Sequence, residues 1–214
     1  MQEVTWAAGV LAYPRKPATI STTLFSLQQA GWPNYILSID SPKGTPGHRG
    51  PWKNFVHLLQ TMIDKSAASH FIVVQDDVEL AVGLRDFIEE TMPKNFGVMS
   101  PYCPSVQDDD KDGWRKNNRI PQEAYGALCY VMRREIAQDL LIYPHNQEAL
   151  IDGAVGAFCK KAGLDYWIHR PSLVKHLGER STLHEFGLTP YRQCKRFRPD
   201  ARQQESIPCL LSSS

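Results

Sequence analysis

The hydrophobic and polar positions of the first hundred residues form two alternating kinds of run. Short apolar runs, typical of buried strands, are followed by stretches in which apolar residues recur every three or four positions, as on one face of a helix. The clearest helical pattern places Trp52, Phe55, Leu59 and Met62 on one face. Such alternation predicts an α/β fold with a mainly parallel sheet. The runs predict strands at residues 4–13, 35–40, 71–75 and 97–100, and helices at residues 19–30, 52–63 and 83–92.

The second half of the chain has a less regular pattern. A polar stretch at residues 101–120 predicts a long loop, and Pro, Arg and Ser dominate from residue 184. We therefore expect one domain over residues 1–183, followed by a basic and partly irregular extension over residues 184–214. Between the loop and this extension, the pattern predicts strands at residues 125–132, 165–169 and 173–177, and helices at residues 135–142 and 151–162.

A strand that ends abruptly in carboxylates is the most informative motif of the chain. Residues 71–74 are apolar, and Gln75, Asp76 and Asp77 follow them directly. A charge at the end of a buried strand is costly unless it is paired, and a divalent cation is a natural partner for carboxylate oxygens. Asp is also common in turns, so a purely structural role is the alternative. Because open α/β sheets bind ligands at strand ends, the motif predicts a metal–diphosphate site.

Composition narrows the class of protein. The chain has 214 residues and a formal net charge of +1, so there is no overall attraction to nucleic acid or to a membrane surface. Its five cysteines are scattered and contain no C-x-x-C pair, which argues against a zinc site and a disulfide framework. No apolar stretch approaches the length of a membrane span, and the N-terminus lacks the pattern of a signal peptide. We expect a cytoplasmic protein, bacterial or phage-encoded, with no membrane insertion.

Motifs that would indicate other functions are incomplete. Residues 108–113 resemble a calcium-binding loop, but Arg119 stands where that loop needs a glutamate. The glycines at positions 44, 47 and 50 are not followed by the Lys and Ser/Thr of a phosphate-binding P-loop. The chain also has no G-x-G-x-x-G after its first strand and no G-x-S-x-G. The sequence therefore argues against a calcium loop, a nicotinamide dinucleotide fold and a serine hydrolase.

Three further features have both a chemical and a structural interpretation. Asp152 lies at the start of a predicted helix, where it acts as a general base, as an N-cap or as both. His176, at the end of an apolar run, is either a metal ligand or a structural histidine. A basic segment with Tyr191 and Phe197 interleaved binds phosphate or is simply solvated, and we favour the second interpretation. Its cations are Arg192, Lys195, Arg196, Arg198 and Arg202.

With these residues assembled, the chain resembles the GT-A fold glycosyltransferases, most closely the N-acetylglucosaminyltransferase I type. The resemblance extends from about residue 12 to residue 176. It is clearest at residues 73–79, Val-Val-Gln-Asp-Asp-Val-Glu, which are similar to that family's D-x-D-like stretch Val-Val-Glu-Asp-Asp-Leu-Glu. Residues 170–173, Arg-Pro-Ser-Leu, are similar to the family's Arg-Pro-Glu-Ile. The resemblance implies a GT-A (Rossmann-like) α/β fold with a mainly parallel central sheet flanked by helices.

The resemblance also implies roles for individual residues. Asp77 would be the direct ligand of a Mn²⁺ (or Mg²⁺) ion on the donor diphosphate, His176 a second ligand, and Asp152 the catalytic base. Asp76 would contact the donor ribose, and Gln75 would face the donor where the family has an acid. The other donor-binding residues that the resemblance implies are Tyr13, Arg15, Asp40, Lys53 and Asn54.

The function that follows is metal-dependent transfer of a sugar from a nucleotide-diphosphate donor, most simply a UDP-sugar, to an acceptor hydroxyl. One general base and no covalent intermediate imply inversion at the anomeric carbon. The acceptor is left open between a glycan or small glycoside and the hydroxymethylated bases of phage DNA. A metal-dependent nucleotidyltransferase is the alternative, because it also combines paired carboxylates, a metal and an α/β sheet. A non-catalytic binding module is a third interpretation.

Overall fold

The computed structural model describes residues 3–14, 18–104, 108, 111–117, 127–144, 150–177 and 193–203. The strands are β1 (Trp6–Ala12), β2 (Ile36–Ile39), β3 (His70–Gln75), β4 (Val78–Leu80), β5 (Val98–Ser100), β6 (Gly113–Lys116), β7 (Cys129–Arg133), β8 (Tyr166–Arg170) and β9 (Val174–His176). A seven-stranded sheet has the order β2-β1-β3-β7-β5-β8-β6, and β4 pairs with β9 in a separate two-stranded sheet. In the larger sheet β1, β2, β3, β5 and β8 run in one direction, and β7 and β6 run against them.

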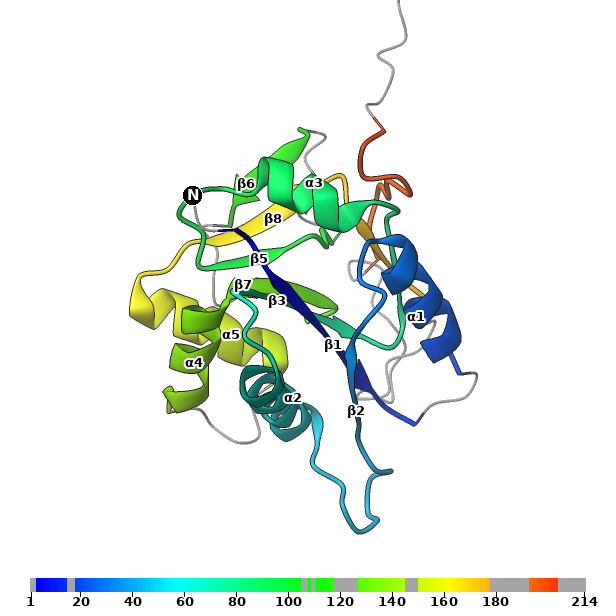
Figure 1. Ribbon diagram of the computed structural model, residues 1–214, viewed down its shortest axis with the longest axis vertical. Coiled ribbons are helices and arrows are strands. Elements are labelled where there is room, and N and C mark those ends of the chain that lie inside the picture. The colour runs from blue at the N-terminus through cyan, green and yellow to red at the C-terminus, as the bar shows by residue number, and fades with distance from the viewer. Residues whose placement is uncertain are drawn as a thin grey trace, which may run out of the picture.

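Helices cover both faces of the larger sheet (Figure 1). The helices are α1 (Ile20–Gln29), α2 (Pro51–Lys65), α3 (Leu84–Thr91), α4 (Arg134–Ile142) and α5 (Ile151–Ala162). Side chains of α2, α4 and α5 share one core cluster with Val73, whereas those of α1 and α3 share the other with Val74. Because successive strand residues point to opposite faces, a strand that is covered on both sides is apolar in its buried part, as residues 71–74 of β3 are. Within the described ranges, no helix has the length and apolar character needed to cross a membrane.

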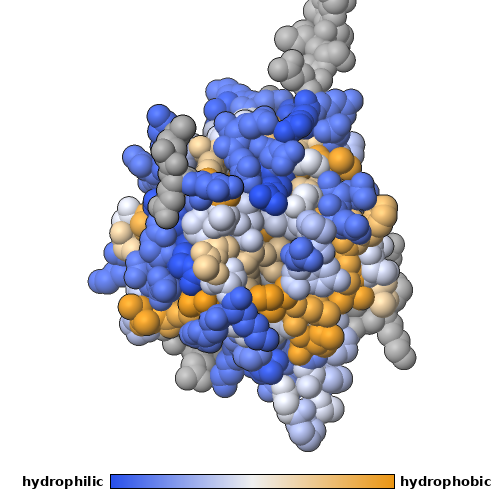
Figure 2. All heavy atoms as spheres, in the orientation of Figure 1, coloured by the Kyte–Doolittle hydropathy of each residue, from blue (hydrophilic) through white to orange (hydrophobic). Residues whose placement is uncertain are grey.

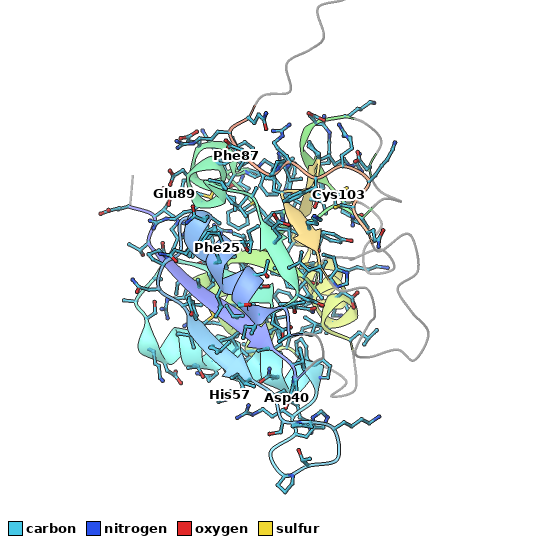
Figure 3. The ribbon with its side chains drawn as sticks, turned by 90° about the vertical axis from the view of Figure 1, so that its right-hand side faces the viewer. Phe25, Asp40, His57, Phe87, Glu89 and Cys103 are labelled. Carbon is cyan, nitrogen blue, oxygen red and sulfur yellow. The ribbon has the colours of Figure 1, made fainter. Side chains whose placement is uncertain are left out.

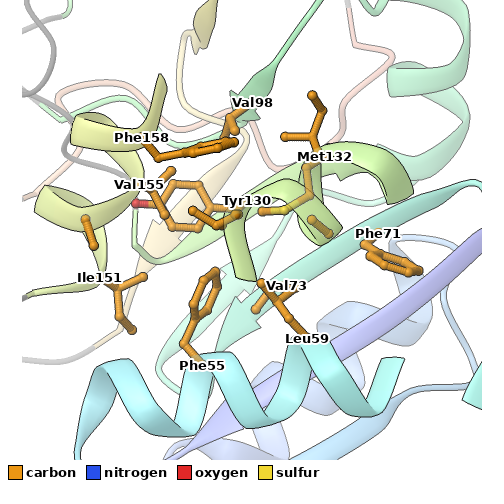
Figure 4. Close-up of a cluster of buried hydrophobic side chains, with 14 of the residues drawn as sticks. Phe55, Leu59, Phe71, Val73, Val98, Tyr130, Met132, Ile151, Val155 and Phe158 are labelled. Carbon is orange, nitrogen blue, oxygen red and sulfur yellow. The ribbon is translucent and has the colours of Figure 1, made fainter. Parts of the chain in front are cut away.

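The larger core cluster joins α2 to β7 and α5 (Figure 4). Phe55 and Leu59 of α2 and Tyr130 of β7 are fully buried, and Phe158 of α5 is 3% exposed. The Phe55 and Tyr130 rings meet edge to face with their centroids 6.3 Å apart, a favourable aromatic geometry. The periodic apolar positions of residues 52–63 therefore form the core-facing side of α2, as their spacing predicts.

The antiparallel strand β7 carries the second half of the chain to the edge where β3 ends. Val74 lies opposite Cys129 in the register of β3 and β7. The N–H of Gln75 donates to the carbonyl of Leu128 at 3.0 Å. Because β7 runs against β3, its first residues lie beside the last residues of β3. The sheet is therefore mainly parallel, with β7 as the one reversed strand between β3 and β5.

Two short strands lie where the sequence predicts none. Residues 113–116 belong to the predicted loop at 101–120 but form β6, which pairs with β8 at the edge of the sheet. The loop prediction is wrong for these residues because an edge strand need not be apolar: Arg115 and Lys116 are exposed. The other is β4, which begins at Val78 directly after the two aspartates and pairs with β9.

Part of the predicted C-terminal extension packs on the domain. The N–H of Arg198 donates to the carbonyl of Ser172 at 2.9 Å, and the N–H of Val82 donates to the carbonyl of Pro199 at 2.8 Å. We call the described residues 193–203 the C-terminal strap. Hydrophilic side chains gather over the neighbouring α3 on the face shown in Figure 2. Residues 184–192, with Arg192, and residues 204–214 lie outside the described residues.

Ion pairs hold the C-terminal strap in place. Arg196 makes a two-pronged contact with the buried Asp108, with 2.7 Å between Nη2 and Oδ1, and also meets Asp112 at 2.9 Å. Arg198 pairs with Asp112 at 3.0 Å, and Arg202 pairs with two carboxylates of α3. These three cations are neutralised within the molecule. The described part of the segment is therefore neither a loosely solvated tail nor an unpaired phosphate-binding surface.

His169 of β8 is a buried histidine enclosed by aromatic rings. Its ring meets Phe87 and Trp114 edge to face at centroid distances of 5.2 and 5.0 Å. Its Nδ1 lies 2.8 Å from the carbonyl of Pro171, so the neutral ring donates its Nδ1–H there. Burial lowers the pKa of His169 from 6.5 to about 4, because the charged form loses its hydration. The imidazole is therefore neutral in the folded protein at neutral pH.

Acidification should destabilise the protein through His169. Between pH 6.5 and pH 4 the unfolded chain binds a proton that the folded one does not, so stability is full above pH 6.5 and falls as the pH is lowered. The loss attributable to this group is up to about 3 kcal/mol. Urea unfolding across this pH range tests the expectation with His169→Asn as the comparison, since it keeps a donor but does not titrate. Parallel pH profiles for the two proteins would assign the acid sensitivity to other groups.

Candidate active site

The carboxyl ends of β1, β2 and β3 meet at one edge of the sheet because these strands run parallel. Tyr13 follows β1, Asp40 follows β2, and Asp76 follows β3. The N–H of Asp40 donates to the carbonyl of Ala12 at 3.0 Å, and the N–H of Asp76 donates to the carbonyl of Leu11 at 2.9 Å. The structure therefore brings three of the predicted donor-binding residues together around the end of β1.

Asp76 is a buried carboxylate whose direction is fixed by the backbone. The residue is 2% exposed, and its Oδ2 accepts the N–H of Tyr13 at 3.0 Å. Its own carbonyl accepts the hydroxyl of Thr19 at 2.7 Å. These bonds tie the turn after β3 to the segment that leaves β1 for α1. A buried carboxylate needs such partners, and here they leave it at the strand edge with a defined orientation.

Asp77 faces His176, which lies 99 positions later in the chain. The two side chains are 6% and 8% exposed, with His176 Nε2 3.0 Å from Asp77 Oδ2. The backbone fixes this approach, because the N–H of Leu177 donates to the carbonyl of Asp77 at 2.7 Å and Val78 lies opposite His176 in the β4–β9 register. The structure therefore joins the two residues that were predicted to bind a metal.

The donor set of this pair fits a divalent cation. His176 Nε2 and Asp77 Oδ2 are within hydrogen-bond distance at 3.0 Å, and adjacent ligands about 2.1 Å from an octahedral ion also lie about 3.0 Å apart. A carboxylate and a neutral imidazole suit Mn²⁺, and the carboxylate suits Mg²⁺. Within the described residues no group of three or more His, Cys, Asp or Glu could hold a metal. A cation at Asp77 and His176 therefore depends on substrate oxygens and water for its other ligands, as nucleotide-bound Mg²⁺ commonly does.

Asp40 organises the loop of residues 41–50 at the base of α2 (Figure 3). Its Oδ1 accepts the N–H groups of Ser41 and Arg49 at 2.9 and 2.7 Å, and its Oδ2 accepts that of Gly50 at 2.9 Å. Gly50 caps α2 with a φ of 79°, a conformation that favours glycine. That Asp40 holds this loop was not predicted from the sequence. The Gly-rich stretch before the proline at the start of α2 could have indicated it, because such a loop needs partners for its backbone N–H groups. Contact between Asp40 and the donor stays a prediction.

The two predicted donor residues of α2 have different surroundings. Asn54 is fully buried, and its Oδ1 accepts the hydroxyl of Ser38 at 2.8 Å, which ties α2 to β2. Lys53 is exposed. Gln75 is half-buried at the end of β3, and Arg15 lies outside the described residues. Their contacts with a donor stay predictions, and Asn54 has a packing role besides.

Asp152 lies in the first turn of α5 on the face of the sheet that α2 also covers. The N-cap of α5 is Leu150, so the interpretation of Asp152 as an N-cap is wrong. Its Oδ1 accepts the N–H of Gly153 at 2.9 Å. Burial raises the pKa of the Tyr130 and Tyr166 hydroxyls, and the nearby charge of Asp152 raises them further. Its role as a catalytic base stays a prediction.

No known protein-family profile matches the chain, and no curated protein sequence matches it significantly. Several solved structures do match it. A197 from STIV has a TM-score of 0.51 and 12% identity, and the match covers 94% of this chain and 99% of that one. A glycosyltransferase involved in the glycosylation of the major capsid of PBCV-1 has a TM-score of 0.48 and 12% identity, covering 82% and 94%. A nucleotidyl transferase from Methanothermobacter has a TM-score of 0.49 and 12% identity, covering 78% and 88%.

These likenesses concern the fold alone, because one fold can host many activities. The match to A197 covers nearly all of both chains. The strand order and the helices on both faces confirm the predicted α/β fold with a mainly parallel central sheet, and the match to A197 agrees with it. The finer likeness to the N-acetylglucosaminyltransferase I type stays a prediction.

Proposed function

We propose that this protein transfers a sugar from a nucleotide-diphosphate donor, with a UDP-sugar as the first choice, to an acceptor hydroxyl with the help of Mn²⁺ or Mg²⁺. The observation that carries the proposal is the buried pair Asp76 and Asp77 at the end of β3, with His176 3.0 Å from Asp77. Two adjacent buried carboxylates are costly, and a cation with bound phosphates offsets that cost. The pair also lies at the strand edge where open α/β sheets bind their ligands.

Each group has a separate task in this proposal. Asp77 and His176 hold the cation, which when bound supplies the positive charge that stabilises the departing diphosphate. Asp76, oriented by the N–H of Tyr13, binds the donor ribose. Asp152 accepts the proton of the acceptor hydroxyl while that oxygen bonds to the anomeric carbon and the bond to the diphosphate breaks. Attack from the opposite face, with one base and no covalent intermediate, inverts the anomeric centre.

A glycan or small glycoside is the acceptor that the charges favour. A protein that binds DNA needs free Lys or Arg side chains to neutralise the phosphates. The basic segment of residues 191–202 was the sequence feature that suggested a DNA acceptor. In the structure Arg196, Arg198 and Arg202 of that segment pair with carboxylates of the same chain. The formal net charge of the whole chain is only +1. Modified DNA is therefore the second choice of acceptor. Strongly salt-dependent binding of the protein to duplex DNA would make it the first.

A panel of nucleotide sugars should stabilise the protein only when Mn²⁺ or Mg²⁺ is present. A ligand at a hundred times its dissociation constant adds about 2.7 kcal/mol to the folded state, which raises the melting temperature by several degrees. Thermal shift measurements with UDP-, GDP-, dTDP- and CMP-linked sugars, each with metal and with EDTA, identify the donor. Incubation of the best donor with acceptor glycosides should then release the nucleoside phosphate.

Two results would contradict this proposal in different ways. Release of pyrophosphate from a nucleoside triphosphate in the presence of a sugar phosphate would establish the nucleotidyltransferase alternative. Absence of stabilisation by every nucleotide, with and without metal, would leave the α/β domain as a binding module for another ligand.

A further inference from the structure

The strand that follows the two aspartates has a strand neighbour on one side only. In the described structure β4 pairs with β9 in a sheet of two strands, separate from the larger sheet. A two-stranded sheet is marginally stable by itself. The other edge of β4 lies against α1. The contacts between α1 and this edge of β4 therefore determine where β4 lies relative to the core.

The register shows which backbone groups of β4 are directed toward α1. Val78 lies opposite His176, and the N–H of Leu177 donates to the carbonyl of Asp77 at 2.7 Å. In an antiparallel ladder, this places Val78 and His176 in a pair that does not exchange hydrogen bonds. The N–H and C=O of Val78 therefore point away from β9. Both groups are buried, so each needs another partner.

A single hydroxyl on α1 satisfies both groups. Thr23 Oγ1 donates to the carbonyl of Val78 at 2.7 Å and accepts the N–H of Val78 at 3.1 Å. One turn later on the helix, Ser26 Oγ accepts the N–H of Leu80 at 3.1 Å. Thr23 is fully buried and Ser26 is 7% exposed. Two polar residues on the core-facing side of α1 thus replace the strand that β4 lacks.

Different elements fix the two aspartates. The carboxylate of Asp76 is oriented by the N–H of Tyr13, and its carbonyl by the hydroxyl of Thr19. Asp77 lies between Asp76 and Val78, the first residue of β4. Its position therefore depends on where Thr23 holds β4. Separate contacts with the segment around α1 therefore support the positions of the two aspartates, in addition to the bond from the N–H of Leu177 to the carbonyl of Asp77.

We propose that Thr23 is a positioning residue for the metal-binding pair: its hydroxyl holds β4 so that Asp77 and His176 form one cation site beside Asp76. This inference rests on the metal site of the proposed function. Thr23 itself touches neither the cation nor the substrate. Its effect passes through Val78, the residue that follows Asp77 and lies opposite His176.

Replacement of Thr23 by valine tests the inference, because valine keeps the shape of threonine and removes the hydroxyl. Groups that hydrogen-bond a metal ligand directly are typically worth a 10- to 100-fold change in metal affinity. Because Thr23 acts through the neighbouring residue Val78, we expect Thr23→Val to weaken Mn²⁺ binding by about tenfold, the lower end of that range. Electron paramagnetic resonance of free Mn²⁺ measures this affinity without any turnover. Thr23→Ser keeps the hydroxyl and should bind Mn²⁺ within about threefold of the wild type.

Ser26→Ala is the matched control, since it removes a buried hydroxyl bond to the same strand at Leu80, farther from Asp77. It should lower the melting temperature but change Mn²⁺ affinity less than Thr23→Val does. Equal losses of affinity in the two variants, or wild-type affinity in Thr23→Val, would overturn the inference while leaving the metal site intact. A tenfold loss in Thr23→Ser would also overturn it, even if Thr23→Val did not fold. A wild-type protein that binds no Mn²⁺ in the presence of a nucleotide sugar would refute the metal site itself.

Discussion

Replacement of Asp77 by alanine is expected to abolish the metal-dependent part of nucleotide binding. Asp77 supplies a carboxylate 3.0 Å from His176, and among the described residues no cluster of three or more ligating side chains could take over. With only the His176 side chain left of the proposed pair, the cation is held mainly by the nucleotide and the link to the protein is lost. We expect the affinity for a nucleoside diphosphate with Mn²⁺ to fall at least about 100-fold, toward its value in EDTA.

Isothermal titration of the nucleoside diphosphate, with Mn²⁺ and with EDTA, measures this difference. Glu79→Gln is a suitable control because Glu79 lies on β4 two positions later but pairs with Lys175, at 3.5 Å, on the solvent-facing side. It should retain the metal dependence of the wild type. If Asp77→Ala bound the nucleotide as the wild type does, with the same gain from Mn²⁺, Asp77 would be excluded from the site.

Asp152→Asn is expected to lower kcat about 100-fold or more while leaving donor affinity nearly unchanged. Asparagine has the shape of aspartate and keeps an Oδ1 that can accept the N–H of Gly153, so the first turn of α5 is preserved. It cannot take the proton of an acceptor hydroxyl. The loss should therefore appear in the transfer step and should remove the acidic limb of the pH–rate profile.

Steady-state kinetics with saturating donor, together with donor affinity from titration, separate these effects. Asp139→Asn changes an exposed carboxylate of α4 and should turn over at the wild-type rate. A normal kcat for Asp152→Asn would exclude Asp152 as the catalytic base. A loss of donor affinity equal to the loss of kcat would mean that the substitution disturbs the fold rather than the proton transfer.

Local pattern predicted the parts of the fold in which burial is strongest. The helix at residues 52–63 was predicted because the core-facing side of α2 is apolar apart from Asn54, and β3 because its residues 71–74, covered on both faces, are all apolar. The strand β6 was not predicted, since an edge strand with Arg115 and Lys116 exposed has no apolar signature. The direction of β7 could not be predicted either, because antiparallel and parallel strands of this length look alike in sequence.

The candidate site shows the same division. A buried strand that ends in Asp76 and Asp77 is visible in the sequence, and so is the late His176. The contacts that orient these groups are not visible, because they come from backbone atoms and from hydroxyls such as that of Thr23, which lies 55 positions before Val78. Asp40 was predicted to bind the donor. Its bonds to the loop of residues 41–50 could not be predicted, because they come from backbone N–H groups, whose direction no residue type specifies.

The contact between Arg196 and the buried Asp108 joins residues 88 positions apart and has a consequence for synthesis on the ribosome. The aspartate leaves the exit tunnel long before its arginine, so it must stay hydrated and the loop that carries it cannot settle in its final place. The same delay applies to Asp77, whose histidine follows 99 positions later. The central β-layer can begin to fold during translation, but the proposed cation site is complete only after residue 176 has emerged. If the proposed function holds, fragments that end before position 176 should be partly folded and should lack the cation site.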